Sequence, residues 1–166
     1  MIINGRELLK AAPIKDMLTR KVRHNGVSHG LAEVGYDIRL KQTVHFKPMG
    51  PTVTRRSAKG VLEETKLGRF ILASTVEEFD MPASLTGIVH DKSTWARLGL
   101  SVFNTVIEPG WKGFLTLELV YHGGDELVIE AGSGIAQVIF HRPSCLAAYS
   151  GKYQNQEDRP VADIRC

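Results

Sequence analysis

The chain has 166 residues, of which 43% are hydrophobic and 23% are charged, and its net charge is +3. This length and composition favour one globular domain over residues 1–166. No apolar run reaches the ~18 residues of a membrane span, and no dense basic run indicates nucleic-acid binding. The N-terminal segment is too polar for a signal-peptide core, so a cytoplasmic location is expected.

The N-terminal segment has the pattern of two short helices. Asn4 can cap the first helix, and Glu7 stands three residues later, in the position of a capping box. Leu8 and Leu9 then provide an apolar side for this helix. A second short helix is predicted over residues 14–22.

From residue 34 onward, short apolar runs alternate with turn residues. The predicted strands cover residues 36–40, 43–46, 61–64, 70–77, 85–89, 100–105, 114–121, 126–130 and 135–141. Residues 93–97 are predicted to form a single helical turn between two of these strands. Many short strands without βαβ alternation indicate a mainly β sandwich or barrel. The polar tail, residues 150–166, is expected to be mobile until a ligand orders it.

The sequence Asp91-Lys92-Ser93-Thr94 precedes the predicted helical turn and carries a cation and two hydroxyls. If Ser93 caps the turn, the backbone N–H groups that follow it converge on one place and can bind an anion. Arg97 lies one turn after Ser93 and can face the same ligand. The alternative interpretation is a capped surface turn with a salt bridge.

Two acidic residues stand out in the second half of the chain. Glu118 interrupts an apolar strand, LTLELV, so its carboxylate is either paired on the surface or held in a site for chemistry. Burial without a cationic partner would raise its pKa toward neutrality, which suits a general base. Glu108, before Pro-Gly-Trp, either accepts a hydrogen bond from a sugar hydroxyl or begins a turn. Trp111 and Phe103 are either core residues or stacking platforms.

The sequence contains no recognisable metal or cofactor motif. The six histidines form no HxH or HExxH pattern, and Cys145 and Cys166 form no CxxC pair, so zinc is not expected. The sequence also has no GxSxG elbow, Walker loop or GxGxxG motif, which argues against hydrolases with a serine nucleophile and against dinucleotide enzymes.

Five segments resemble, in order, the motifs of the dCTP deaminase and dUTPase superfamily. They are GYDIRL (35–40), DKSTWARLGL (91–100), EPGWKGFLTLEL (108–119), GSGIAQVIF (132–140) and GKYQNQ (151–156). With both Arg97 and Glu118 present, the sequence resembles the deaminase branch more than the dUTPase branch. The resemblance implies a dUTPase-like distorted jelly roll or β-barrel. It also implies a homotrimer whose active sites lie between neighbouring subunits.

The resemblance also implies a reaction, the hydrolytic deamination of dCTP to dUTP and ammonia, which supplies dUTP for thymidylate synthesis. Glu118 would activate the water, while Ser93 and Arg97 would order it and stabilise the tetrahedral intermediate. The implied substrate-binding residues are Lys92, Thr94, Tyr149, Lys152 and Gln156 for the triphosphate, Glu108 and Trp111 for the deoxyribose, and Asn104 and Thr105 for the base. Mg²⁺ would enter bound to the triphosphate, and no zinc would be required.

Two departures from the deaminase pattern leave other nucleotide functions open. The segment 98–107 is shorter than in that pattern and lacks its Thr-Ala-His or Thr-Ala-Gly step, and Glu108 replaces the usual aspartate. The alternatives are a dUTPase, a bifunctional enzyme that forms dUMP from dCTP, and a non-catalytic nucleotide-binding regulator on the same fold.

Overall fold

The computed structural model describes residues 1–48, 50–57, 60–65 and 69–165, with side chains described outside residues 49–68; Cys166 lies outside the described residues. Within these ranges the chain forms fourteen strands and two short helices. In chain order the elements are β1 (Ile2–Ile3), α1 (Gly5–Ala11), β2 (Lys21–His24), β3 (Val27–Leu31), β4 (Tyr36–Arg39), β5 (Val44–Lys47), β6 (Gly50–Ser57), β7 (Gly60–Thr65), β8 (Phe70–Asp80), β9 (Thr86–Asp91), α2 (Ser93–Ala96), β10 (Leu100–Val102), β11 (Val106–Ile107), β12 (Lys112–Tyr121), β13 (Leu127–Ile129) and β14 (Gly134–His141).

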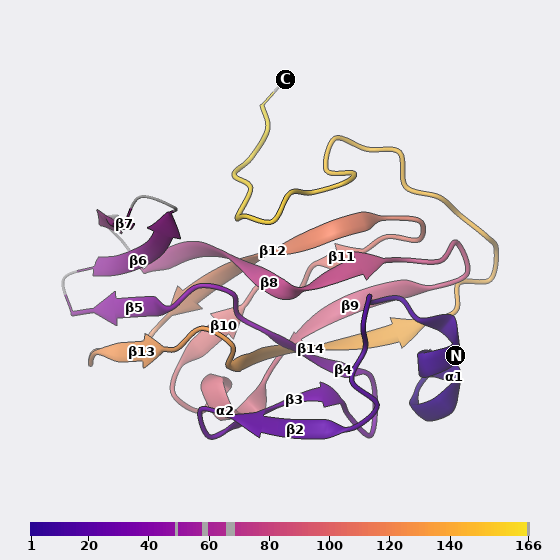
Figure 1. Cartoon of the computed structure of the whole chain (residues 1–166), viewed down its shortest axis with the longest axis horizontal. Helices are drawn as coiled ribbons and strands as arrows, with labels where there is room; N and C mark the ends of the chain where they lie inside the picture. Colours follow the sequence, from indigo (N-terminus) through magenta and orange to yellow (C-terminus); the bar gives the residue numbers. More distant parts are fainter. Residues whose placement is uncertain (49, 58–59, 66–68, 166) are drawn as a thin grey trace.

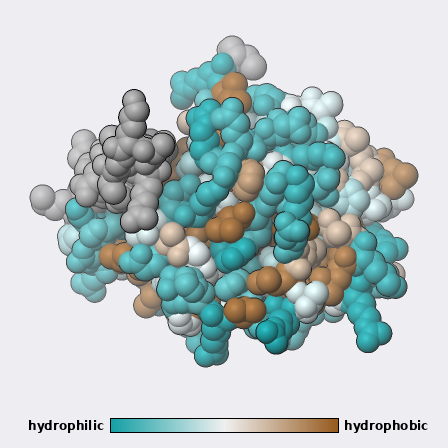
Figure 2. Space-filling model, in the orientation of Figure 1, coloured by the Kyte–Doolittle hydropathy of each residue, from teal (hydrophilic) through white to brown (hydrophobic). Residues whose placement is uncertain are grey.

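The strands pair into three antiparallel sheets (Figure 1). The largest has the order β11-β9-β14-β4-β3-β2, with β1 added to β14; the others have the orders β10-β12-β8 and β13-β5-β6-β7. Fully buried side chains such as Tyr36, Phe46 and Phe79 come from three different sheets and join in one core. On the face in Figure 2, apolar side chains therefore appear only at separate places among polar ones. The mainly β fold class predicted from the sequence is confirmed.

Each of the nine predicted strands matches an observed strand, and α2 confirms the predicted helical turn. Strand β10 is shorter than predicted, because it ends at Val102 rather than at residue 105. The sequence did not predict β1, β2, β3, β6 or β11. In the ranges described above, no helix is both long enough and apolar enough to cross a membrane.

The second predicted helix, over residues 14–22, is wrong. Ile14 lies fully buried in an isolated bridge with Phe79 of β8, and the Lys15 N–H donates to the Glu78 carbonyl. The chain then turns and enters β2. Burial of Ile14 against the sheet outweighs the weak helical pattern of this segment, because tertiary packing overrides local propensity.

The capping box predicted for the first helix is also wrong, although α1 itself is confirmed. The Asn4 side chain makes no hydrogen bond to the helix end; its amide donates to the Glu33 carbonyl at 2.9 Å. The Glu7 carboxylate instead accepts from Lys10, three residues further along the exposed face of the helix. Asn4 therefore ties the start of α1 to the loop that precedes β4.

The C-terminal tail runs back over the molecule and lies along β12 (Figure 1). Gln156 forms a parallel bridge with Gly113, and its carbonyl accepts from the Phe114 N–H at 3.1 Å. The Trp111 indole N–H donates to the Tyr153 carbonyl at 2.6 Å. These contacts make the tail one wall of a cavity beside β12.

Replacing Gly113 by alanine is expected to displace the tail from β12. A Cβ at this position would lie 2.5 Å from the Gln156 nitrogen and 2.6 Å from its oxygen, and the φ of +129° disfavours alanine. Limited trypsin digestion should therefore cleave after Lys152 faster than in the unsubstituted chain. Gly124→Ala, where a Cβ meets nothing within 4 Å, is the matched control. Equal cleavage rates in the two variants would contradict the proposed clash.

Candidate functional site

A cavity of about 420 Å³ lies between β12, the segment around β11 and the tail. Six residues predicted for the site line it together: Thr105, Glu108, Trp111, Glu118, Tyr149 and Gln156. They come from three separate stretches of the sequence, which the fold brings to one place. This cavity is the candidate active site.

Glu118 occupies the part of the cavity formed by β12 and β8. It is paired in register with Leu72 of β8, which also lines the cavity. Its Oε2 is buried and has no hydrogen-bond partner among the described residues. Burial beside apolar neighbours raises the pKa of the Glu118 carboxyl. A hydrogen bond from its own backbone N–H opposes this shift, and no cation among the described residues adds to that opposition. Glu118 thus has the environment expected of a general base that takes and returns a proton.

The raised pKa of Glu118 predicts how stability changes with pH. The folded state binds a proton more tightly than the unfolded state, so this carboxyl stabilises the fold at low pH. The stabilisation is lost as pH rises through the raised folded-state pKa. Glu118→Gln should therefore raise the Tm at neutral pH, by about 2–4 °C for each kcal/mol gained, and leave it little changed below about pH 4.

Thermal unfolding across pH 4 to 8 measures this difference. Glu7→Gln is a matched control, because Glu7 is exposed and Lys10 lowers the pKa of its carboxyl. The control should show no gain in Tm at neutral pH. A pH profile of Glu118→Gln that follows that of the unsubstituted chain would contradict the prediction.

The turn before β12 forms another part of the cavity wall. The Glu108 carbonyl accepts a hydrogen bond from the Trp111 N–H at 3.1 Å. Glu108 therefore begins a turn, which was one of the two interpretations of this residue from the sequence. Trp111 is buried, and the centroids of its ring and the Phe79 ring are 6.0 Å apart, yet Trp111 also lines the cavity. Phe103 is half exposed rather than in the core, and its ring packs at 6.1 Å against Phe70 of the cavity wall.

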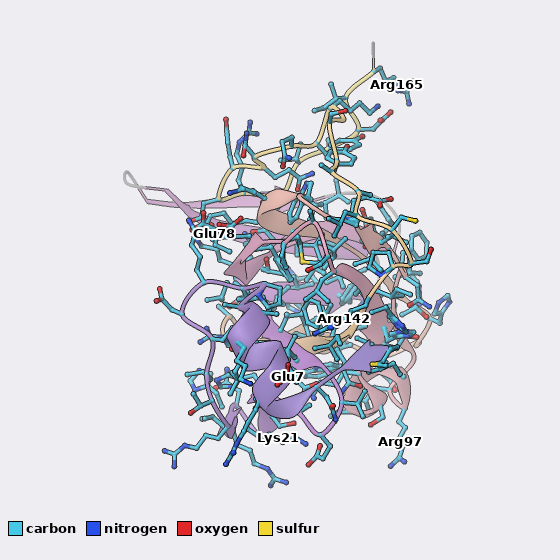
Figure 3. All side chains as sticks on the ribbon, turned by 90° about the vertical axis from the view of Figure 1, so that its right-hand side faces the viewer. Glu7, Lys21, Glu78, Arg97, Arg142 and Arg165 are labelled. Atoms are coloured by element: carbon cyan, nitrogen blue, oxygen red, sulfur yellow. The ribbon has the colours of Figure 1, made fainter. Side chains whose placement is uncertain are left out.

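The α2 segment does not line this cavity. In Figure 1, α2 and the tail lie on opposite sides of the molecule, and in Figure 3 Arg97 projects outward at the end opposite Arg165. Ser93, Thr94 and Arg97 are exposed. Ser93 is the first residue of α2 and Lys92 occupies the N-cap position, so the condition that Ser93 caps the turn is not met. A single chain therefore does not bring Ser93 and Arg97 together with Glu118.

Three other predicted substrate-binding residues lie outside the cavity lining. The Lys92 ammonium donates to the Asp37 carboxylate at 2.6 Å. Asn104 is exposed beyond the end of β10. Lys152 contacts the last residues of the tail, through the Asp163 carboxylate at 3.3 Å and a neighbouring carbonyl at 2.6 Å.

Several cavity residues escaped the sequence analysis. Thr116 is two residues before Glu118 in β12, and strand alternation alone could have placed both on one face. Its hydroxyl donates to the Gln156 side chain at 3.2 Å. Phe70 and Leu72 line the cavity because β8 pairs with β12. Tyr153 and Asp163 line it because the tail folds back over β12. No sequence signal indicates that pairing.

The cavity has an unusual balance of charge for a triphosphate site. Among its lining residues within the described ranges, Glu108, Glu118 and Asp163 are acidic and none is basic. The described part of the chain also contains no cluster of three or more His, Cys, Asp or Glu side chains that could hold a metal ion. The described lining of one chain therefore offers carboxylates but no cation that could bind phosphate groups.

Comparison with known proteins places the fold and the cavity in context. Residues 2–143 match the family model described as dCTP deaminase-like. The chain is 34% identical to the dCTP deaminase of Protochlamydia amoebophila (strain UWE25), over 89% of each protein. In three dimensions it is similar to the 2'-deoxycytidine 5'-triphosphate deaminase from Agrobacterium tumefaciens, with a TM-score of 0.57 and 17% identity over 86% of this chain and 48% of that one.

The chain is also similar in fold to the native EIAV dUTPase, with a TM-score of 0.50 and 16% identity over 91% of this chain and 96% of that one. This likeness confirms the predicted dUTPase-like fold. The family model covers most of the chain, and a relative above 30% identity covers nearly all of it. The chain belongs to the dCTP deaminase-like family.

Proposed function

We propose that this protein converts dCTP to dUTP and ammonia, with Glu118 as the general base. The observation that carries the proposal is the buried, unpartnered Oε2 of Glu118 at the wall of a cavity of about 420 Å³. Burial raises the pKa of this carboxyl toward neutrality, which suits a general base. The dCTP deaminase named among the relatives supports dCTP as the substrate.

The reaction follows from one proton moving through Glu118. The carboxylate takes a proton from a water molecule, whose oxygen attacks C4 of the cytosine to form a tetrahedral intermediate. Glu118 then gives the proton to the exocyclic nitrogen, the C4–N bond breaks, and ammonia leaves. The proton of the new C4 hydroxyl moves to N3, which gives the uracil base. Ser93 and Arg97 would order the water and stabilise the charge that develops in the intermediate.

A second copy of the chain must complete this site. The cavity lining carries no cation among its described residues, whereas Ser93, Thr94 and Arg97 are exposed on α2 of the same chain. A homotrimer would bring α2 of one subunit to the cavity of its neighbour. Exposed apolar side chains around the cavity support such a contact, because a large uncovered apolar patch is unfavourable in water. They are Phe70, Phe103 and Val106, with 44%, 51% and 54% of their surface exposed.

The remaining substrate contacts follow the shape of the cavity. Thr105, with the exposed Asn104 next to it, would contact the base, and Glu108 and Trp111 would lie beside the deoxyribose. The substrate would enter as the magnesium complex of dCTP. Its phosphates would extend toward a neighbouring α2 and the tail, where Thr94, Tyr149, Lys152 and Gln156 are the proposed ligands.

Incubation of the purified full chain with dCTP and Mg²⁺ tests the proposal. A coupled assay should detect ammonia, and chromatography should show dUTP as the product. Parallel reactions with dCMP, and with dCTP modified at C5 of the base, define the substrate range. If none of these nucleotides is deaminated, the proposed function is wrong.

A bifunctional activity, from dCTP to dUMP, is the second candidate. The segment that carries the proposed base contacts is short, because only residues 103–105 separate β10 from β11. This segment departs from the deaminase pattern in length, and the fold is shared with dUTPases. Pyrophosphate release from dUTP would support this candidate. Deamination without any pyrophosphate release would exclude it.

A further inference from the structure

The segment that carries Ser93 and Arg97 is fixed to the rest of the fold by neighbouring side chains, Asp91 before it and Trp95 within it. The Asp91 carboxylate accepts from the Val102 N–H at 2.7 Å. The Trp95 indole N–H donates to the Gly134 carbonyl at 2.7 Å, and its ring is buried. The inward residues thus fix the segment, while the outward residues remain exposed for contact with a ligand.

Lys92 belongs to the inward set. Its ammonium lies 2.6 Å from the Asp37 carboxylate, and only 10% of the Lys92 side chain and 4% of the Asp37 side chain are exposed. The Ser28 hydroxyl donates to the same Asp37 oxygen at 3.3 Å. Lys92 follows β9 and Asp37 lies in β4, and β14 runs between these two strands. The ion pair therefore joins strands that make no direct hydrogen bonds to each other.

This arrangement leaves Lys92 poorly suited to bind phosphate. Asp37 neutralises its charge at contact distance, and most of its surface is inaccessible to a ligand. A triphosphate would have to compete with the carboxylate and leave Asp37 buried without its partner, which is strongly unfavourable. Arg97, which is exposed, has neither constraint.

Resting on the proposed function, we propose that Lys92 is a positioning residue. Its buried ion pair with Asp37 fixes the start of α2, so that Ser93, Thr94 and Arg97 are held in the geometry that completes the site. Lys92 itself does not bind the triphosphate. Lys92 is the residue directly before α2, so the position of its backbone sets where that helix begins.

Exchange of the ion pair for an apolar pair separates positioning from phosphate binding. Removal of one partner leaves a buried unpaired charge, whereas replacement of both partners by apolar side chains is often tolerated. Lys92→Met should lower the kcat for dCTP deamination by about tenfold or more, and the Asp37→Leu/Lys92→Met pair should recover kcat to within about threefold of the unsubstituted protein. A phosphate ligand would show no such rescue, because both variants lack the ammonium.

The KM for dCTP gives an independent readout. A positioning role predicts that the KM of the Asp37→Leu/Lys92→Met pair stays within about threefold of the unsubstituted value. Lys10→Met, which removes an exposed ion pair with Glu7, is the matched control for the loss of one lysine charge. An apolar pair variant that is folded and still has a raised KM, equal to that of Lys92→Met, would overturn the inference.

Folding is monitored through the Tm of each variant. If the apolar pair variant does not fold, the Asp37→Asn/Lys92→Gln pair, which can form a neutral hydrogen bond, decides the question in the same assays. Absence of deamination by the unsubstituted protein contradicts the proposed function and not this inference. In that case the affinity for dCTP, measured by calorimetry, is compared between Lys92→Met, the pair variant and the unsubstituted protein. Rescue of affinity in the pair supports positioning, and loss of affinity in both variants, or no binding by any of them, overturns it.

Discussion

Glu118→Gln is expected to lower the kcat for ammonia release from dCTP by about 10³-fold, within the usual range for loss of a general base. Glutamine keeps the size of the side chain but cannot take the proton from water. Because Oε2 of Glu118 has no partner among the described residues, the substitution breaks no structural hydrogen bond at that atom. Affinity for dCTP, measured by calorimetry, should change by no more than about threefold, since the loss concerns the reaction rather than ground-state binding.

The matched control is Glu7→Gln, an exposed carboxylate on α1 that lies outside the cavity lining. This variant should retain the activity of the unsubstituted protein. Full deamination by Glu118→Gln would show that another group activates the water. Loss of dCTP binding together with activity would instead show that Glu118 holds the substrate.

The same variant tests the second candidate function. If Glu118→Gln loses deamination but still releases pyrophosphate from dUTP, one pocket supports two reactions with different requirements. Attack at a phosphorus atom does not involve C4 of the base, so it has no need of the proton transfer assigned to Glu118. Loss of both activities at once would tie them to a shared step.

The strands of this fold could be predicted because their signals are local. Runs such as 114–121 combine apolar residues with flanking turn residues, and these runs became strands. The missed strands are short or polar. β2, with the sequence KVRH, has little apolar content and exists because β3 pairs with it over four residues. Around Ile14 the error is the opposite one, because a helix was predicted where none forms. A bridge to Phe79 overrides the helical pattern of these residues.

The candidate site was predictable as a set of residues and not as a geometry. Glu118 could be singled out because a carboxylate in an apolar strand conflicts with its surroundings, and such conflicts mark functional positions. Its partners in the cavity depend on the pairing of β8 with β12 and on the course of the tail. The role of Lys92 could not be read from its motif. The choice between a carboxylate and a phosphate as its partner depends on Asp37, 55 positions away.

Two inactive variants are expected to restore each other's activity when they are assembled into one oligomer. Arg97→Ala and Glu118→Gln should each be inactive alone, because each removes a proposed catalytic group. If every site combines the cavity of one subunit with α2 of the next, a random mixture contains some intact sites. They pair Glu118 from an Arg97→Ala chain with Arg97 from a Glu118→Gln chain. About a quarter of the sites in a 1:1 assembly should be of this kind, so activity should recover toward a quarter of the unsubstituted level.

Co-expression of the two chains with different affinity tags, followed by tandem purification, isolates the mixed oligomers. In a mixed trimer one site of the three is intact, so the purified fraction should have about a third of the unsubstituted activity, compared with about a quarter before purification. A mixture of Arg97→Ala with Ser93→Ala is the matched control, because both substitutions affect the α2 side and no site can regain both groups. Activity in the first mixture and none in the second would show that the two halves of the site come from different chains. No activity in either mixture would mean that α2 and the Glu118 cavity of one chain act together. The tail and α2, on opposite sides of the fold in Figure 1, would then have to approach each other by a large rearrangement.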